Sequence, residues 1–198
     1  MDQLSARINS LPVSETLAMA AKARELKNKG IDIIGLSLGE PDFNTPEFIK
    51  DAAIQAVKDN YNSYSPVDGY ADLKQAICAK FKRDNNLNYS PSQIVVSTGA
   101  KQSIANLCMV LLDPGDEVLL PAPYWVSYSA IATLAEATSI IIPSSIETDF
   151  KITPEQLEAF ITPKTKLVMF NSPNNPSGTI YTEAEYRALG KVLEKYPN

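Results

Sequence analysis

Three short segments carry side chains suited to binding a charged or planar ligand, and each directly follows a stretch that predicts a β-strand. The first, Gly99-Ala100-Lys101-Gln102, leads into a predicted helix. Small residues at a helix N-terminus let backbone N–H groups approach a phosphate, and the helix dipole favours the anion. Ser97, Thr98 and the Lys101 cation would add to such a site. The alternative is a tight strand-to-helix turn with a solvated lysine.

The other two segments offer a flat ring and an amide. Pro121-Ala122-Pro123-Tyr124-Trp125 holds the single Trp of the sequence, whose indole suits a planar ring, although a Trp that fills the core is the alternative. The stretch 171–178 repeats Ser-Pro and Asn-Pro steps, which predict an irregular turn able to hold cis peptide bonds and to aim one amide at a ligand. A rigid turn and no more is the alternative there. Ligands of open α/β sheets bind at such carboxyl ends of strands.

The composition excludes several other kinds of chemistry. The sequence has no His, which removes a Ser-His-Asp triad, a Cys-His pair and an HExxH zinc site. It has no Gly-x-Gly pair for a dinucleotide, and Gly190-Lys191-Val192 lacks the remaining residues of a P-loop. With 18 basic and 23 acidic residues, the net charge of −5 argues against a nucleic acid or an anionic membrane as partner. The two cysteines, Cys78 and Cys108, favour a reduced chain over a disulfide scaffold.

The elements that must position these segments follow from hydrophobic periodicity and from helix end signals. Strands are predicted over residues 31–38, 94–98, 117–120, 139–142 and 166–171. Helices are predicted over residues 14–29, from Thr45 as cap with Pro46 in the first turn, around Leu73, Ile77 and Phe81, over 100–112 and 124–135, from Pro154, and over 183–195. The pairs Thr153 with Gln156 and Thr182 with Glu185 predict capping boxes.

This order of elements predicts an α/β fold of three layers, with a mostly parallel sheet and helices on both of its faces. A chain of 198 residues is long enough for one complete domain. However, the last predicted helix ends at Tyr196-Pro197-Asn198, where the alternation requires another strand. Because a sheet cut there has an unpaired edge, we expect the chain to be part of a longer protein.

Six motifs stand in register along essentially the whole chain. They are Gly39-Glu40-Pro41-Asp42-Phe43, Tyr64-Ser65-Pro66 with Gly69, Gly99-Ala100-Lys101-Gln102, Asp113-Pro114-Gly115-Asp116, Pro123-Tyr124-Trp125 and Ser172-Pro173-Asn174-Asn175-Pro176-Ser177-Gly178. In order and spacing the sequence resembles the class I, fold type I aminotransferases, which use pyridoxal 5'-phosphate, and within them the bacterial-type aspartate aminotransferases. The resemblance implies that the complete protein transfers the amino group of L-aspartate to 2-oxoglutarate.

The resemblance also implies which residues bind the cofactor. Gly99, Ala100 and Lys101 correspond to the segment at the cofactor phosphate, in agreement with the argument from the helix N-terminus. Trp125 matches the aromatic residue that stacks on the pyridine ring. Asn175 matches the amide that donates to the ring oxygen of the cofactor.

Substrate contacts are implied in the same way. Gly39 matches a backbone contact to the substrate carboxylate, which Asn175 also touches beside Trp125. Lys101 matches the residue that favours acidic side chains by pairing with the distal carboxylate. Tyr64 matches a tyrosine that reaches the phosphate of the neighbouring subunit, so the resemblance implies a homodimer with shared active sites.

No catalytic residue of this family is expected within the chain. The lysine that forms the Schiff base, the Asp and Tyr at the cofactor ring and the Arg that binds the substrate carboxylate match positions beyond Asn198. None of Lys101, Lys164, Lys166 and Lys191 stands at the matching site. We therefore expect the chain to be inactive alone, with residues 1–45 forming an N-terminal arm and small-domain segment and residues 46–198 the N-terminal part of the large cofactor domain.

Two other interpretations stay open. One is another amino-acid aminotransferase, of aromatic or alanine type, or a β-lyase of the same fold. The other is a short non-catalytic module that keeps the fold for dimerisation or ligand sensing. The expected ligands are amino acids and 2-oxo acids, with no metal. Because Met1-Asp2-Gln3-Leu4 lacks the basic and apolar pattern of a signal peptide, a cytoplasmic location is expected.

Overall fold

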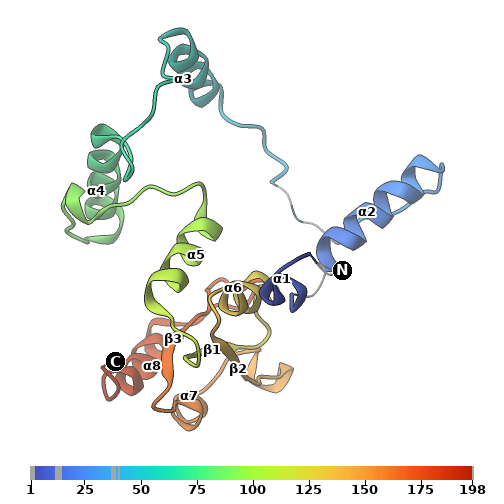
Figure 1. Ribbon diagram of the computed structural model, residues 1–198, viewed down its shortest axis with the longest axis vertical. Coiled ribbons are helices and arrows are strands. Elements are labelled where there is room, and N and C mark those ends of the chain that lie inside the picture. The colour runs from blue at the N-terminus through green and yellow to red at the C-terminus, as the bar shows by residue number, and fades with distance from the viewer. Residues whose placement is uncertain (1–2, 12–14, 37–38, 40, 198) are drawn as a thin grey trace. The chain divides into compact units, whose positions relative to one another are not determined.

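The computed structural model describes residues 3–11, 15–36, 39 and 41–197. The chain divides into two units, and Figure 1 labels the helices and strands that belong to them. Residues 1–12 and 98–198 form the first, which we call the sheet unit, and residues 13–97 form the second, the helical unit. The division of the complete protein at residue 45 stays a prediction.

The sheet unit alternates helices and strands, as the sequence predicts. Its elements are α1 (Ala6–Asn9), α5 (Ala100–Leu111), β1 (Glu117–Pro121), α6 (Ser127–Leu134), β2 (Thr138–Ile142), the short 3₁₀ turn η2 (Ile146–Thr148), α7 (Pro154–Phe160), β3 (Thr165–Val168) and α8 (Glu183–Leu193). The predicted capping boxes at the starts of α7 and α8 are both confirmed.

The three strands form a parallel sheet in the order β2-β1-β3, with β1 in the centre. Leu119 of β1 stands opposite Ile140 of β2 and Val168 of β3. The register of β1 with β3 shifts once, between Glu117 and Val118. A central parallel strand is covered on both faces, which is why consecutive apolar residues follow Glu117 in β1 and the stretch from Val118 to Leu120 is fully buried.

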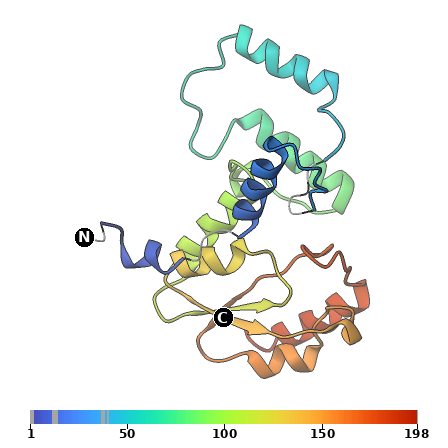
Figure 2. The same cartoon turned by 90° about the vertical axis from the view of Figure 1, so that its right-hand side faces the viewer.

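The two faces of the sheet carry separate apolar clusters, because successive side chains of a strand point to opposite sides. Val118 and Leu120 pack with Cys108 of α5 and Ile131 of α6 on one face. Leu119 packs on the other face with the cluster of Ile142, Ile152, Leu157, Tyr181, Leu189 and Val192, to which α7 and α8 contribute. Figure 2 shows the yellow α6 on one side of the strands and the orange α7 and red α8 on the other. The predicted three-layer fold is confirmed.

The helical unit contains α2 (Glu15–Asn28), α3 (Glu47–Lys58), α4 (Ala71–Asn85) and the 3₁₀ turn η1 (Pro91–Gln93). Its turn before α4 is held by an ion pair between Lys74 and Asp68, and the hydrogen bond from Lys74 lowers the pKa of Asp68. The backbone N–H of Val96 also donates to the carbonyl of Asp68 over 3.1 Å. No helix in the described part of the chain is both long and apolar enough to span a bilayer.

Two strand predictions are wrong within the described residues. Residues 31–36 and 94–98 belong to no β-strand, while residues 37 and 38 lie outside the described part. A strand requires a ladder of hydrogen bonds to a neighbour, and the described residues of the helical unit supply no such strand. Both segments therefore have the apolar pattern of a strand but no strand to pair with among the described residues of the helical unit.

Two helix starts also differ from the prediction. The helix expected over 124–135 begins at Ser127, and the one expected to be capped by Thr45 has Pro46 as its N-cap, without a side-chain capping bond. In the first case the backbone N–H of Tyr128 donates to the carbonyl of Trp125, so the preceding residues form the turn into the helix.

Candidate functional site

Three loops of the sheet unit meet beyond the carboxyl ends of β1 and β3. The Nζ of Lys101, at the start of α5, lies 4.9 Å from the ring centroid of Trp125, which follows β1. The side-chain Nδ2 of Asn174, in the loop after β3, donates to the carbonyl of Pro123 over 3.2 Å. We call residues 121–126 the Trp loop and residues 171–181 the Asn loop. These contacts bring together segments that are far apart in the sequence.

The N-terminus of α5 is open to an anion. Gly99, its N-cap, has φ +83° and ψ 163°, and a Cβ built on it would meet no atom within 4 Å. The backbone N–H groups of Ala100 and Lys101 have no partner among the described residues, since the first α5 bonds run from Gln102 and Ser103 to the carbonyl of Gly99. Unpaired N–H groups at the positive end of a helix dipole attract a negative group. Lys101 is exposed beside them.

Trp125 serves as part of the core and also as part of the surface. Its ring packs against the cluster around α5 and α6, edge-to-face on Tyr128 with centroids 5.6 Å apart and an interplanar angle of 86°. Burial raises the pKa of the Tyr128 hydroxyl. The indole is nevertheless only half-buried, and the Lys101 ammonium lies over it at cation–π distance. The ring is thus held by the core and accessible from the site.

The Asn loop has the irregular backbone that its Ser-Pro and Asn-Pro steps predict. Its Ser172–Pro173 and Asn175–Pro176 bonds are cis, and in the Trp loop the Ala122–Pro123 bond is also cis. The side chain of Asn175 is exposed, and its side-chain amide group has no hydrogen-bond partner among the described residues. An unpaired amide at this position can donate to and accept from a ligand.

Gly39 and Tyr64 belong to the helical unit, whereas Lys101, Trp125 and Asn175 belong to the sheet unit. Both are exposed, and Tyr64 is fully so. Within the sheet unit the structure brings together Lys101, Trp125 and the loop of Asn175, whereas Gly39 and Tyr64 belong to the other unit. Their roles stay predictions.

Sequence reasoning missed two residues that hold the Asn loop. Asn174 stands in the motif next to Asn175, but no local pattern indicates that its amide reaches a carbonyl 51 positions earlier. The hydroxyl of Tyr181 accepts from the buried backbone N–H of Ile152 over 2.9 Å, which ties the end of the loop to the start of α7. For the Tyr181 bond, the sequence offers one signal, which is a Tyr placed after a predicted strand and a polar loop.

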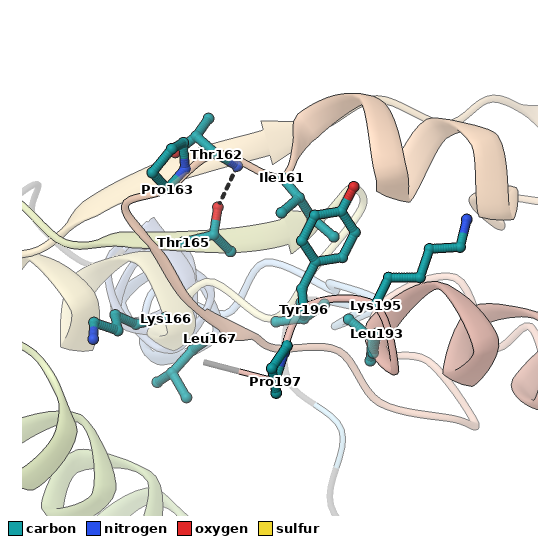
Figure 3. A pocket seen from close by; sticks show the side chains of 11 residues that line it. Ile161, Thr162, Pro163, Thr165, Lys166, Leu167, Leu193, Lys195, Tyr196 and Pro197 are labelled. Carbon is teal, nitrogen blue, oxygen red and sulfur yellow. Dashed lines mark hydrogen bonds between the residues drawn. The ribbon is translucent and has the colours of Figure 1, made fainter.

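A separate pocket of about 430 Å³ lies along the outer edge of β3 (Figure 3). It is lined by residues of β3 and of the turn before it, by Leu193 at the end of α8, and by Tyr196 and Pro197, which follow that helix. The turn is closed by a hydrogen bond of 2.9 Å from the N–H of Thr162 to Oγ1 of Thr165. Because none of the residues at the three loops lines it, this pocket is not part of the candidate site.

The sheet unit is thus an α/β arrangement, with a parallel sheet covered on both faces. At the carboxyl ends of its strands, an open helix N-terminus, an accessible indole and an unpaired side-chain amide offer groups suited to an anionic group and a flat ring. The model of the family "Aminotransferase class I and II" matches residues 31–198, and the chain belongs to this family.

Three known proteins illustrate the relationship. An aspartate/prephenate aminotransferase of Nitrosomonas europaea is 53% identical over 99% of this chain and 49% of its own length. An aspartate aminotransferase of Bacillus subtilis is 50% identical over 96% of this chain and 48% of its own. The crystal structure of an aspartate aminotransferase from Rhizobium meliloti matches 100% of this chain and 49% of its own with a TM-score of 0.94 and 46% identity. The chain spans about half the length of the relatives it matches.

Proposed function

We propose that the complete protein is an aminotransferase that moves the amino group of L-aspartate to 2-oxoglutarate with pyridoxal 5'-phosphate as cofactor. The observation that carries this proposal is that the α5 N-terminus, the Trp loop and the Asn loop meet at the carboxyl ends of the strands. The chain in which they meet belongs to the aminotransferase family. The names of the relatives support aspartate as the substrate.

The residues present fit the cofactor by chemistry and by available space. The free N–H groups of Ala100 and Lys101, with open space at Gly99, suit its phosphate. The accessible indole of Trp125 suits its planar ring, and the amide of Asn175 suits its ring oxygen. When bound, the cofactor supplies an electron sink for the substrate, and the protein supplies binding and orientation.

Lys101 has the charge that an acidic substrate needs. Its side chain is exposed at the site and forms no ion pair with an Asp or Glu in the described part of the chain. A second carboxylate on the substrate would supply that partner, and an ion-paired hydrogen bond of this type contributes about 1.5–3 kcal/mol. We therefore assign the distal carboxylate of aspartate to Lys101.

A second candidate substrate is prephenate, which the Nitrosomonas europaea relative carries in its name. Prephenate is a 2-oxo acid with a second carboxylate, so the same lysine would bind it. Rates of the complete protein with aspartate as donor and either 2-oxoglutarate or prephenate as acceptor separate the two functions.

The test of substrate class uses Lys101→Gln in the complete protein. We expect the KM for aspartate to rise about 10- to 100-fold, while the KM for phenylalanine changes little, because only aspartate loses an ion pair. Lys164→Gln is the matched control, since Lys164 is an exposed lysine away from the site. A wild-type protein that is faster with phenylalanine or alanine than with aspartate would refute the proposed specificity.

The shared active site is part of the same proposal. We assign Tyr64, which is fully exposed in this chain, to the cofactor phosphate of a second subunit, and Gly39 to the substrate carboxylate. A cytoplasmic homodimer is the expected form of the complete protein. Sedimentation velocity of the complete protein tests the dimer, and a monomer with full activity would contradict the role of Tyr64.

A further inference from the structure

The Asn174 side chain links the two loops that present the candidate site. Its Nδ2 donates to the Pro123 carbonyl over 3.2 Å, and its Oδ1 accepts from the backbone N–H of Ser177 at 3.1 Å and from the Ser177 hydroxyl at 3.0 Å. Its backbone N–H donates to the carbonyl of Thr179 over 2.8 Å. The amide thus joins the Asn loop to the Trp loop with one end and closes the Asn loop with the other.

The neighbouring Asn175 has the opposite character. Asn174 is half-buried and bonded through both ends of its amide, whereas Asn175 is exposed with its amide unpaired. The two adjacent asparagines therefore differ in role: the Asn174 side chain forms hydrogen bonds within the protein, and the Asn175 side chain is available to a ligand. The backbone joins them directly, so a shift of Asn174 moves Asn175.

The acceptor of this bond is itself held in place. Next to Pro123, the backbone N–H of Ala122 donates to the carbonyl of Ile142 over 2.9 Å, and the hydroxyl of Ser144 donates to the carbonyl of Ala122. Trp125 follows two residues later with its ring against the core. The Pro123 carbonyl is thus a fixed point on the loop that carries the indole.

We propose that Asn174 is a positioning residue that sets the place of the Asn175 amide relative to the ring of Trp125. Its assignment to cofactor binding rests on the proposed function, whereas the link between the loops rests on the Asn174–Pro123 bond alone. Without the Nδ2 donor, the Pro123 carbonyl loses its partner on the Asn loop, and no other hydrogen bond joins the two loops among the described residues.

The test compares Asn174→Asp and Asn174→Ser with a matched control in the 198-residue chain. Both variants remove the Nδ2 donor to Pro123 and keep a side-chain oxygen as acceptor. An ionised Asp has no donor, and the Ser hydroxyl, which can donate, stands one bond closer to the backbone than Nδ2. The control, Ser177→Ala, removes three hydrogen bonds inside the Asn loop, one with Asn174 Oδ1 and two with Thr179, and leaves the Nδ2 donor to Pro123 in place. Far-UV circular dichroism confirms that each variant is folded, and Asn174→Ser replaces Asn174→Asp if the latter is not.

Two measurements use Trp125, because it is the single Trp of the chain. The first is quenching of its fluorescence by acrylamide, which reports how tightly the Trp loop is held and needs no ligand. The second is its energy transfer to added pyridoxamine 5'-phosphate, which has the phosphate and ring of the cofactor but no aldehyde to react with surface lysines. For the loss of one hydrogen bond we expect the Kd for pyridoxamine 5'-phosphate to rise about fivefold, together with stronger quenching.

The outcomes distinguish the positioning role of Asn174 from the proposed cofactor binding. Stronger quenching and weaker binding in both Asn174 variants, without these changes in Ser177→Ala, support the positioning role. Unchanged quenching in the Asn174 variants overturns it, and so do equal changes in Ser177→Ala, because the effect would then be a general loosening of the Asn loop. A wild-type chain that binds no pyridoxamine 5'-phosphate shows that the residues of this chain do not hold the cofactor by themselves, and the quenching comparison still decides whether Asn174 holds the loops together.

Discussion

Replacing Tyr181 by Phe tests the hydrogen bond that closes the Asn loop against the core. The Tyr181 hydroxyl accepts from the backbone N–H of Ile152 over 2.9 Å, and the two residues are only 6% and 5% exposed. Burial raises the pKa of this hydroxyl, so it stays protonated at neutral pH. The substitution removes the oxygen and leaves the rest of the side chain in place.

The expected loss of stability in Tyr181→Phe follows from the groups that remain buried after the substitution. The ring of Tyr181 lies 5.4 Å from that of Phe170 and 5.7 Å from that of Tyr186, and these contacts survive the change. The N–H of Ile152, however, loses its only partner among the described residues. A buried donor left without a partner costs about 1–3 kcal/mol, so we expect the free energy of unfolding to fall by that amount.

The assay is urea unfolding followed by the fluorescence of Trp125, which lies in the same unit as Tyr181. Tyr186→Phe is the matched control. Its ring belongs to the same aromatic group, but the residue is 42% exposed and its hydroxyl has no partner among the described residues. We expect Tyr186→Phe to change the free energy of unfolding by less than about 0.5 kcal/mol. A Tyr181→Phe chain as stable as this control would refute the reasoning.

Four further substitutions test the start of α8 and two tight turns. Thr182→Ala removes the N-cap of α8 and should lower the free energy of unfolding by about 1 kcal/mol in the same urea assay; no loss would contradict the capping role. The backbone N–H of Thr182, and then Lys151, lower the pKa of Glu185 from its ordinary value of 4.5. The stability from this carboxylate is therefore complete above pH 4.5 and is lost as the pH falls through its lowered pKa. Urea midpoints between about pH 3 and 6 should fall less steeply for Glu185→Gln than for wild type, and parallel curves would count against the linkage. Gly69→Ala should destabilise the helical unit more than Gly115→Ala destabilises the sheet unit. Both glycines have positive φ, but only at Gly69 would a Cβ come within 2.5 Å of a side-chain carbon of Val96. Circular dichroism in urea measures both, and equal losses would show that the close approach costs nothing.

Local signals in the sequence predict much of the sheet unit. The capping boxes at Thr153 and Thr182 appear as expected, because the bonds that form them join residues three positions apart. The strand predicted over 117–120 is β1, and the one over 139–142 is β2. The strand predicted over 166–171 begins one residue earlier and ends at Val168.

Features that depend on residues distant in the sequence are predicted wrongly or not at all. Residues 31–36 and 94–97 have the apolar character of strands, but a strand exists only where another strand pairs with it. In the same way, the motif containing Asn174 predicts an irregular turn without indicating the bond to Pro123. The assignments of Gly39 and Tyr64 rest on resemblance and stay predictions.

The sequence by itself determined the family, through six motifs in register, and the order and ends of most helices of the chain, because periodicity and capping act over a few residues. It also determined which residue types are available for binding. Only the tertiary structure decided which of them meet. Lys101 lies over Trp125, and Asn174 reaches Pro123, because a parallel sheet gathers the loops at the carboxyl ends of its strands. Side-chain contacts across 24 and 51 positions depend on that packing, and no local pattern encodes them.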